Sequence, residues 1–156
     1  MLDTERTLRG ALAGALATVA MSALMIVGMV TGLAPMPEPI PKALAALVLG
    51  SAPQPAIMAT AIVGHLGYGA VWGGLLFGSR DEVDLTAGLL LGVGLWVLMG
   101  LAALPLLGWG LFGTAITPRV AVATLVLHLV YGATLAPAYE ALASTAQPAS
   151  EPPAGA

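Results

Sequence analysis

The sequence predicts an all-α membrane protein, a four-helix transmembrane bundle made of two parallel helical-hairpin repeats. Three observations predict it: the composition, four long apolar stretches, and a pattern shared between pairs of those stretches. Of 156 residues, 58% are hydrophobic and 8% are charged, whereas soluble domains carry about 25% charged residues. This composition excludes an ordinary soluble domain and a disordered chain. The formal net charge of -3 excludes nucleic-acid binding, and the absence of Cys excludes disulfides and thiolate chemistry.

The apolar stretches cover about residues 8–33, 56–79, 83–107 and 119–142. A hydrocarbon core about 30 Å thick needs about 20 apolar residues in a helix, and each stretch reaches that length. A transmembrane β-barrel would instead show alternating segments of about 10 residues. The first stretch exceeds the roughly 7–15 apolar residues of a cleaved signal peptide, so we expect it to be retained as a helix.

The segments between and after these stretches complete the predicted organisation. Prolines alternate with other residues over 35–41, which favours a stiff, extended path. The apolar residues 42–50 are too few to span, so we expect a helix that lies at the interface or re-enters. The transmembrane domain is predicted over 1–143, and the tail 144–156, poor in large apolar residues, is predicted to be disordered.

Four spans place both termini on one side of the membrane. That side would carry Arg6, Arg9 and Arg80, against Lys42 and Arg119 on the other. Because basic residues are enriched on the cytoplasmic side, the sequence favours cytoplasmic termini in a multi-pass protein of the cell membrane.

A repeated motif links the second and fourth stretches. Pro55 and Pro118 are each followed ten residues later by His-Leu-x-Tyr-Gly-Ala, which begins at His65 and at His128. The first and third stretches also match, at an offset of 78 residues. The predicted repeats are 8–79 and 83–142, and each holds two spans. The second and fourth helices would then run in the same direction, with the two histidines at similar depth.

Glycines mark where we expect the helices to touch. Steps of two small residues four apart let helix backbones approach closely. Gly69 and Gly132 each follow a histidine by four residues, which places the histidines on the packed face, toward the bundle interior. The predicted packing glycines are Gly10, Gly14, Gly69, Gly73, Gly88, Gly92 and Gly132.

The candidate functional residues are His65, Tyr68, His128 and Tyr131, as ligands or as a proton relay. Ionisable residues inside a membrane are costly and therefore suggest function. Several interpretations stay open. The histidines are neutral and bonded across a helix interface, they ligate haem b from two helices, or they line a proton or substrate path. Zinc or copper is a further option, although two histidines leave a tetrahedral site short of ligands.

No catalytic constellation appears in the sequence, so we expect no enzyme activity and no cofactor beyond the haem alternative. The expected role is an accessory or structural subunit. Its glycine faces would pack against other membrane subunits or a second copy of the chain. The alternatives are a haem-b-binding protein or a small proton-coupled transporter that uses His65 and His128. Among the other apolar residues, Met21, Met25 and Met29 are expected to fill gaps between helices, and Trp109 is expected at the membrane interface.

The third and fourth stretches resemble a known family. Residues 104–113 read LPLLGWGLFG and residues 128–135 read HLVYGATL. This pattern, best over residues 88–142, resembles small four-helix prokaryotic membrane proteins related to the YagU-like inner-membrane group, whose function is uncharacterised. The resemblance implies a four-helix membrane fold and assigns no catalytic or binding residue.

Overall fold

The computed structural model describes residues 2–80 and 82–146, and it confirms an all-helical fold with no strand in that part of the chain. Within these described residues, four helices are long and apolar enough to cross a membrane: α1, α3, the run Leu85–Leu106, and α6. In order, the elements are α1 (Thr4–Val30), α2 (Ile40–Leu49), α3 (Gln54–Ser79), α4 (Leu85–Leu98), the π-helical turn η1 (Met99–Ala103), α5 (Leu104–Leu106), the 3-10 turn η2 (Leu111–Gly113) and α6 (Arg119–Ala146).

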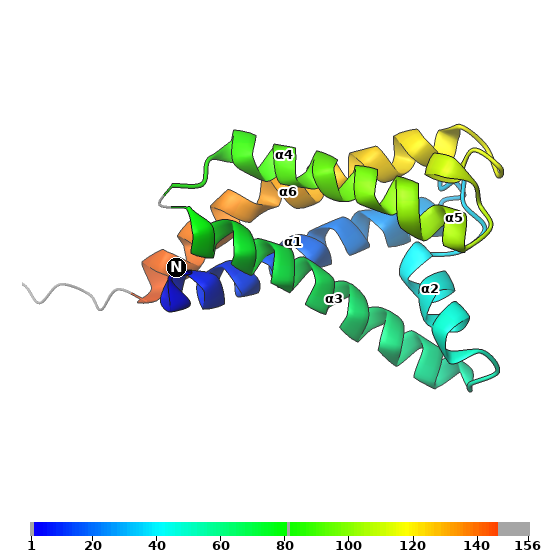
Figure 1. Ribbon diagram of the computed structural model, residues 1–156, viewed down its shortest axis with the longest axis horizontal. Helices are drawn as coiled ribbons and strands as arrows, with labels where there is room; N and C mark the ends of the chain where they lie inside the picture. Colours follow the sequence, from blue (N-terminus) through cyan, green and yellow to red (C-terminus); the bar gives the residue numbers. More distant parts are fainter. Residues whose placement is uncertain (1, 81, 147–156) are drawn as a thin grey trace, which may run out of the picture.

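The long helices alternate in direction, so the start of α1 and the end of α6 lie at the same end of the molecule (Figure 1). We call this the terminal end. α3 packs on α1, α1 packs on α6, and α6 packs on α4, whereas α3 and α4 make at most slight contact with each other. The bundle is therefore not closed between α3 and α4. The short helix α2 packs against α3 at the opposite end of the molecule.

Backbone contact at glycines holds α1 against α3. A methyl group at Gly14 would lie 2.2 Å from the carbonyl oxygen of Gly69, and one at Gly73 would lie 2.5 Å from that of Gly10. These distances are far below any real contact of a Cβ atom, so only glycine permits this approach. The α1–α3 pair is thus a small-residue interface of the kind found between membrane helices.

The α4–α6 pair uses the same kind of contact. A methyl group at Gly88 would lie 2.3 Å from the carbonyl oxygen of Gly132, and one at Gly92 would lie 2.4 Å from that of His128. Together with the α1–α3 contacts, these place all seven predicted packing glycines against helices of the same chain.

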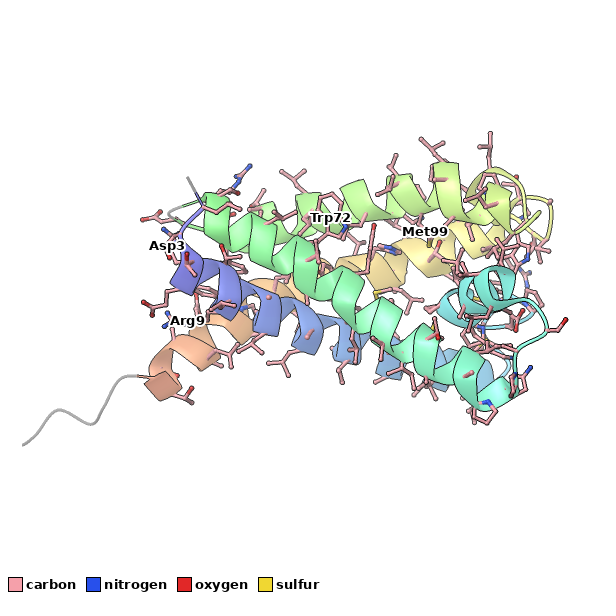
Figure 2. The ribbon with its side chains drawn as sticks, turned by 60° about the horizontal axis from the view of Figure 1, so that its bottom comes forward. Asp3, Arg9, Trp72 and Met99 are labelled. Atoms are coloured by element: carbon pink, nitrogen blue, oxygen red, sulfur yellow. The ribbon has the colours of Figure 1, made fainter. Side chains whose placement is uncertain are left out.

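The outer faces of the long helices are apolar and exposed. Leu8 is 64% exposed, Val63 70%, Leu90 67% and Val122 64%. Such a surface would drive association in water, but it suits contact with lipid. The charged groups lie near the helix ends: Asp3 and Arg9 are at the terminal end, whereas Trp72 and Met99 lie along the spans (Figure 2).

Two helix ends differ from the sequence prediction. α1 begins before residue 8, at Thr4, because Asp3 caps it and its Oδ1 accepts a hydrogen bond from the Arg6 backbone N–H at 2.8 Å. α6 continues to Ala146, so residues 144–146 are helical, where the sequence predicts the start of a disordered tail. The hydroxyls of Ser144 and Thr145 donate to carbonyls one turn earlier, which satisfies these polar side chains within the helix. The rest of the predicted tail, 147–156, lies outside the described residues.

The third span is not the uniform α-helix that the sequence predicts. It passes through the π-helical turn η1 just before Pro105. Proline has no N–H to donate to the preceding turn, which disturbs the regular hydrogen-bond pattern. After it, the chain turns back through residues in the left-handed region, including Phe112 at φ 53°. A methyl group at Gly100 would lie 2.3 Å from the Phe112 ring, so this glycine leaves room for the ring.

Candidate functional site

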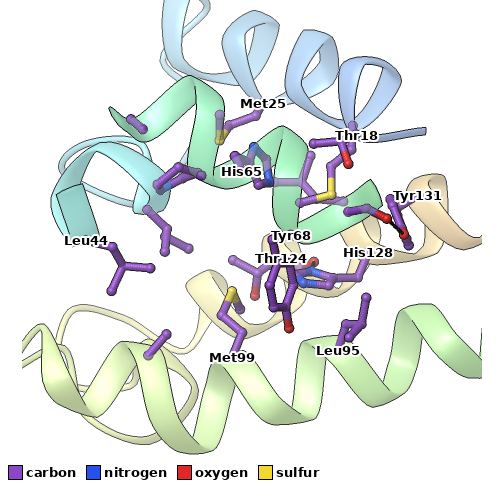
Figure 3. A pocket seen from close by; sticks show the side chains of 18 of the residues that line it. Thr18, Met25, Leu44, His65, Tyr68, Leu95, Met99, Thr124, His128 and Tyr131 are labelled. Carbon is purple, nitrogen blue, oxygen red and sulfur yellow. Dashed lines mark hydrogen bonds between the residues drawn. The ribbon is translucent and has the colours of Figure 1, made fainter. Parts of the chain in front are cut away.

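A cavity of about 450 Å³ lies between the long helices and α2. Its walls come from α1, α2, α3, α4 with η1, and α6 (Figure 3). This volume is within the range of about 300–1,000 Å³ typical of small-molecule sites. Because α3 and α4 do not close on each other, the cavity occupies the space that a closed bundle would fill with side chains.

Most of the cavity wall is apolar, and the predicted methionines contribute to it. Met21 and Met25 of α1 line it, and Met99 of η1 lies across from them. Met29, the third residue of the predicted series, packs instead in a second cluster with Met36 and Trp109. The four candidate residues predicted from the sequence, His65, Tyr68, His128 and Tyr131, all line this one cavity.

His128 presents an unsatisfied ring nitrogen to the cavity. It is 6% exposed, and its Nδ1 lies 2.8 Å from the carbonyl oxygen of Thr124, one turn earlier in α6. A carbonyl oxygen can only accept, so Nδ1 carries the hydrogen. In the neutral ring, Nε2 is then an acceptor. Among the described residues, none donates a hydrogen bond to Nε2. Since these residues include no enclosed polar side-chain atom without a partner, Nε2 borders the open cavity.

His65 has different surroundings. Its Nδ1 lies 3.3 Å from the hydroxyl oxygen of Ser22 on α1. A hydroxyl can donate or accept, so this contact fits either tautomer of the ring. His65 is half-buried, and it faces the same cavity as His128 from α3 (Figure 3). The two histidines therefore line the same cavity from different helices, His65 from α3 and His128 from α6.

The two tyrosines also differ. The Tyr131 hydroxyl donates to the carbonyl oxygen of Gly69 at 2.7 Å, which joins α6 to α3, and the side chain is buried. Its proton is thus engaged by the backbone of another helix and not by His128. Tyr68 is 41% exposed and meets Trp72 edge-on, with ring centroids 6.1 Å apart. Of the two, Tyr68 is the one at the opening of the cavity.

Sequence reasoning missed three polar residues of α1 and α6. Thr18 and Thr124 line the cavity, and Ser22 contacts His65. The Thr18 and Thr124 hydroxyls donate to carbonyls of their own helices at 2.8 Å, so neither is a free donor. Thr18 and Ser22 are four residues apart on one face of a span, and that spacing of small polar residues was the available signal.

The cavity opens between α3 and α4, beside α2. Its exposed lining residues come from these helices: Val48 is 78% exposed, Tyr68 41% and Leu98 45%. The wall formed by α1 and α6 is buried, with Thr18 1% exposed and Leu127 8%. We call this opening, lined by Val48, Tyr68 and Leu98, the mouth.

The mouth extends from α2, where Val48 lies, to the middle of α3, where Tyr68 lies close to His65. His65 is eleven residues after the first residue of α3 and fourteen before the last. At a rise of 1.5 Å per residue it lies about 16 Å and 21 Å from the two ends. A bilayer core about 30 Å thick would therefore surround this level, and the mouth would face lipid.

The cavity carries no formal charge from the protein. None of the described residues that line it is Asp, Glu, Lys or Arg. In the described part of the chain, no group of three or more His, Cys, Asp or Glu residues is arranged to hold a metal ion. The chemistry available in the cavity is therefore hydrogen bonding from two imidazoles, the Tyr68 phenol and the Thr60 hydroxyl, within mostly apolar walls.

No curated protein and no solved structure shows significant similarity to the chain. The similarity that does appear is to a family without an assigned function, as the sequence resemblance implied, but nothing supports the YagU-like grouping. The family match extends over all four long helices and over every residue of the cavity wall. With its match spanning residues 4–150, the chain belongs to DUF6789, a family of unknown function.

Proposed function

We propose that this is an integral membrane protein that takes up one lipophilic molecule from the bilayer. The site is the cavity between α3 and α4, with His65, Tyr68 and His128 facing the ligand. The observation that carries the proposal is the combination of an apolar cavity, a mouth that reaches mid-span, and an unsatisfied His128 nitrogen inside. Binding sites for small molecules are typically concave and apolar with a few placed polar groups.

The packing of the glycines favours this function over an accessory or structural subunit. The glycine faces that would serve such a subunit already pack within the chain, α1 on α3 and α4 on α6. Among the described glycines of the spans, an added Cβ would meet no atom within 4 Å only at Gly64, Gly67 and Gly94. These three are scattered over two helices, and Gly64 lines the cavity itself.

We also propose that the terminal end lies in the cytoplasm. Arg6, Arg9 and Arg80 are all at this end, and the Arg6 guanidinium donates to the carbonyl oxygen of Arg80. Lys42 pairs with Glu38 at the opposite end, at 3.0 Å. The larger number of basic residues at the terminal end supports this orientation under the positive-inside rule.

A bulky side chain at the mouth tests the binding proposal. Gly64 lines the cavity and Gly67 does not, yet an added Cβ at either position would meet no atom within 4 Å. Both Gly64→Trp and Gly67→Trp should therefore fold. We expect Gly64→Trp to reduce labelling of cavity residues by a photoactivatable diazirine-hexadecanol in lipid vesicles about tenfold, a loss of roughly 1.4 kcal/mol of binding. Gly67→Trp should label like the native protein.

The readout is the set of labelled residues, identified by mass spectrometry of the digested protein. Labelling confined to the cavity wall and lost only in Gly64→Trp supports the site. Labelling spread evenly over the lipid-facing residues, with the same yield in all three proteins, would contradict it.

A second candidate ligand is haem b, held by His65 and His128. The favouring observation is that the two imidazoles line one cavity from different helices, and that Nδ1 of His128 donates to a carbonyl. In metal-binding histidines, one ring nitrogen commonly donates to a carbonyl or carboxylate while the other binds the metal. Haem would supply redox chemistry there. Its propionates would have to leave through the mouth, because neither Lys nor Arg is among the described residues that line the cavity.

An optical spectrum decides the haem proposal. Protein expressed with ample haem should show haem bands in a reduced-minus-oxidised spectrum, and these should disappear in His65→Ala and in His128→Ala. A native spectrum without such bands would remove this candidate and leave the lipophilic ligand.

A further inference from the structure

We propose that the molecule in the cavity is uncharged and ends in a hydrogen-bond donor, an alcohol or a phenol, that donates to Nε2 of His128. This inference rests on the proposed function, since it names the class of ligand for that same site. It is carried by the orientation of one buried ring and by the residues that surround the cavity.

The ring of His128 is fixed as an acceptor toward the cavity. Its Nδ1–H is held by the Thr124 carbonyl at 2.8 Å, which leaves the lone pair of Nε2 as the free hydrogen-bonding site of the neutral ring. The backbone around it is also fixed, because Gly92 of α4 packs directly on the His128 carbonyl. Nε2 borders the cavity and is not enclosed by protein, because the described residues hold no enclosed polar side-chain atom without a partner. Its partner therefore has to come from the occupant of the cavity, and an acceptor that stays unpaired beside an apolar occupant is unfavourable. A ligand that donates to Nε2 removes that cost, whereas a ligand that can only accept does not.

The surroundings select against a charged head group. None of the described lining residues is Asp, Glu, Lys or Arg, and the polar groups of α1 and α6 that face the cavity are largely bonded to backbone carbonyls. A carboxylate, phosphate or ammonium would enter without a permanently charged counter-ion, which is unfavourable in apolar surroundings. An alcohol or phenol needs one acceptor, and among the polar groups of the cavity Nε2 of His128 is the one whose acceptor role is fixed by a hydrogen bond at the other ring nitrogen.

The position of His128 sets the direction of the ligand. The ring belongs to the buried wall formed by α1 and α6, and the mouth lies on the other side, at Val48 and Leu98. Figure 3 shows the His128 ring within the cavity, across from Met99. The polar end of the ligand therefore lies inside, and its apolar chain leads through the mouth to the lipid.

Three probes with the same chain test the head group in vesicles of phosphatidylcholine. Each carries the diazirine in a hexadecyl chain and ends in a hydroxyl, a methyl ether or a carboxylate. The alcohol and the ether can both accept a hydrogen bond, but only the alcohol can donate one. Comparing their labelling therefore isolates the effect of donation. We expect the alcohol to label cavity residues about tenfold more than the ether, from the net value of one hydrogen bond at a buried acceptor. The carboxylate at pH 8 should label them least.

Two matched variants locate the acceptor. His128→Phe keeps an aromatic ring without Nε2, so both the alcohol and the ether should still label the cavity, with a ratio near one. His65→Phe changes the other ring of the same cavity and should leave the ratio as in the native protein. This ratio is insensitive to a general loss of folded protein, which would lower both labels together.

The outcomes separate the two proposals. Equal labelling of the cavity by alcohol and ether in the native protein overturns the donor inference and leaves the cavity as a binding site. A ratio that falls in His65→Phe but not in His128→Phe also overturns it, because the acceptor is then the other ring. Absence of cavity labelling by all three probes overturns the proposed function itself.

Discussion

Gly14→Ala is expected to lower the free energy of unfolding by about 2 kcal/mol. Its methyl group would lie 2.2 Å from the carbonyl oxygen of Gly69, 2.9 Å from that carbonyl carbon, and 3.2 Å from the Cα of Ala70. All three are backbone atoms of α3, so no side-chain rotation can relieve the overlap. The helices α1 and α3 would have to separate. Overpacking costs about 1–3 kcal/mol, and an overlap with backbone atoms that cannot rotate away belongs at the upper end of that range. About 1 kcal/mol is recovered from the better helix propensity of alanine, which leaves a net loss of about 2 kcal/mol.

Gly28→Ala is the matched control on the same helix. Its Cβ would lie 3.6 Å from that of Ala34, an ordinary van der Waals contact. This variant should be as stable as the native protein, or more stable by up to about 1 kcal/mol. The measurement is unfolding in mixed micelles with increasing SDS, followed by circular dichroism. If the two variants unfolded at the same SDS fraction, close packing of α1 on α3 would not be a source of stability.

The glycine contacts show which part of the fold follows from sequence. Four apolar stretches predict four long helices because a bilayer fixes the length of a span, and the structure has helices of that length. Pairs of glycines four residues apart predict close contact, because a helix presents residues i and i+4 on one face. Both signals are local. They do not say which pairs of helices leave a gap, and the opening between α3 and α4 could not be predicted from them.

The repeat illustrates the same limit at the candidate site. It predicts that His65 and His128 lie at similar depth on helices that run the same way, and the repeat stays a prediction from the sequence. The surroundings of the two rings differ: His128 bonds to its own helix, whereas His65 meets Ser22 of α1. The two hairpins also differ in register. Gly14 faces Gly69 in the first hairpin, whereas in the second Gly92 faces the His128 carbonyl, one turn earlier.

Trp109 shows how tertiary packing overrides a positional expectation. Its place near the end of a span favours the membrane interface, and its depth in the bilayer stays a prediction, but the ring does not face outward as a residue of an aromatic belt would. The side chain is 8% exposed and packs with Met36 and Ile40. The chain after Pro105 folds back on the start of α2, and the ring covers that contact. The sequence alone does not show the turn at Gly108 and Gly110, both at φ 74°. Nor does it show that the chain after this turn contacts the start of α2.

Gly92→Ala is expected to weaken both the bundle and the candidate site. Its methyl group would lie 2.4 Å from the carbonyl oxygen of His128 and 3.2 Å from the carbonyl carbon, again backbone atoms. We expect a loss of about 2 kcal/mol in the free energy of unfolding, from overpacking at the upper end of about 1–3 kcal/mol less a gain of about 1 kcal/mol in helix propensity. Because α6 must move at His128 itself, Nε2 should also shift away from its place in the cavity.

Gly94→Ala, two residues further along α4, is the matched control, because it changes the same helix without changing the contact at His128. A Cβ at Gly94 would meet no atom within 4 Å, so this variant should keep native stability and native labelling by the diazirine-hexadecanol. Gly92→Ala should fold in lipid vesicles yet lose most of the preference for the alcohol over the methyl ether. That result would tie the contact between α4 and α6 to the hydrogen-bonding geometry of His128, because one displaced backbone carbonyl would explain both effects.

A Gly92→Ala protein that is less stable but keeps the full alcohol preference would contradict this link. The ring would then be oriented by Thr124 and the cavity wall, independently of how closely α4 approaches.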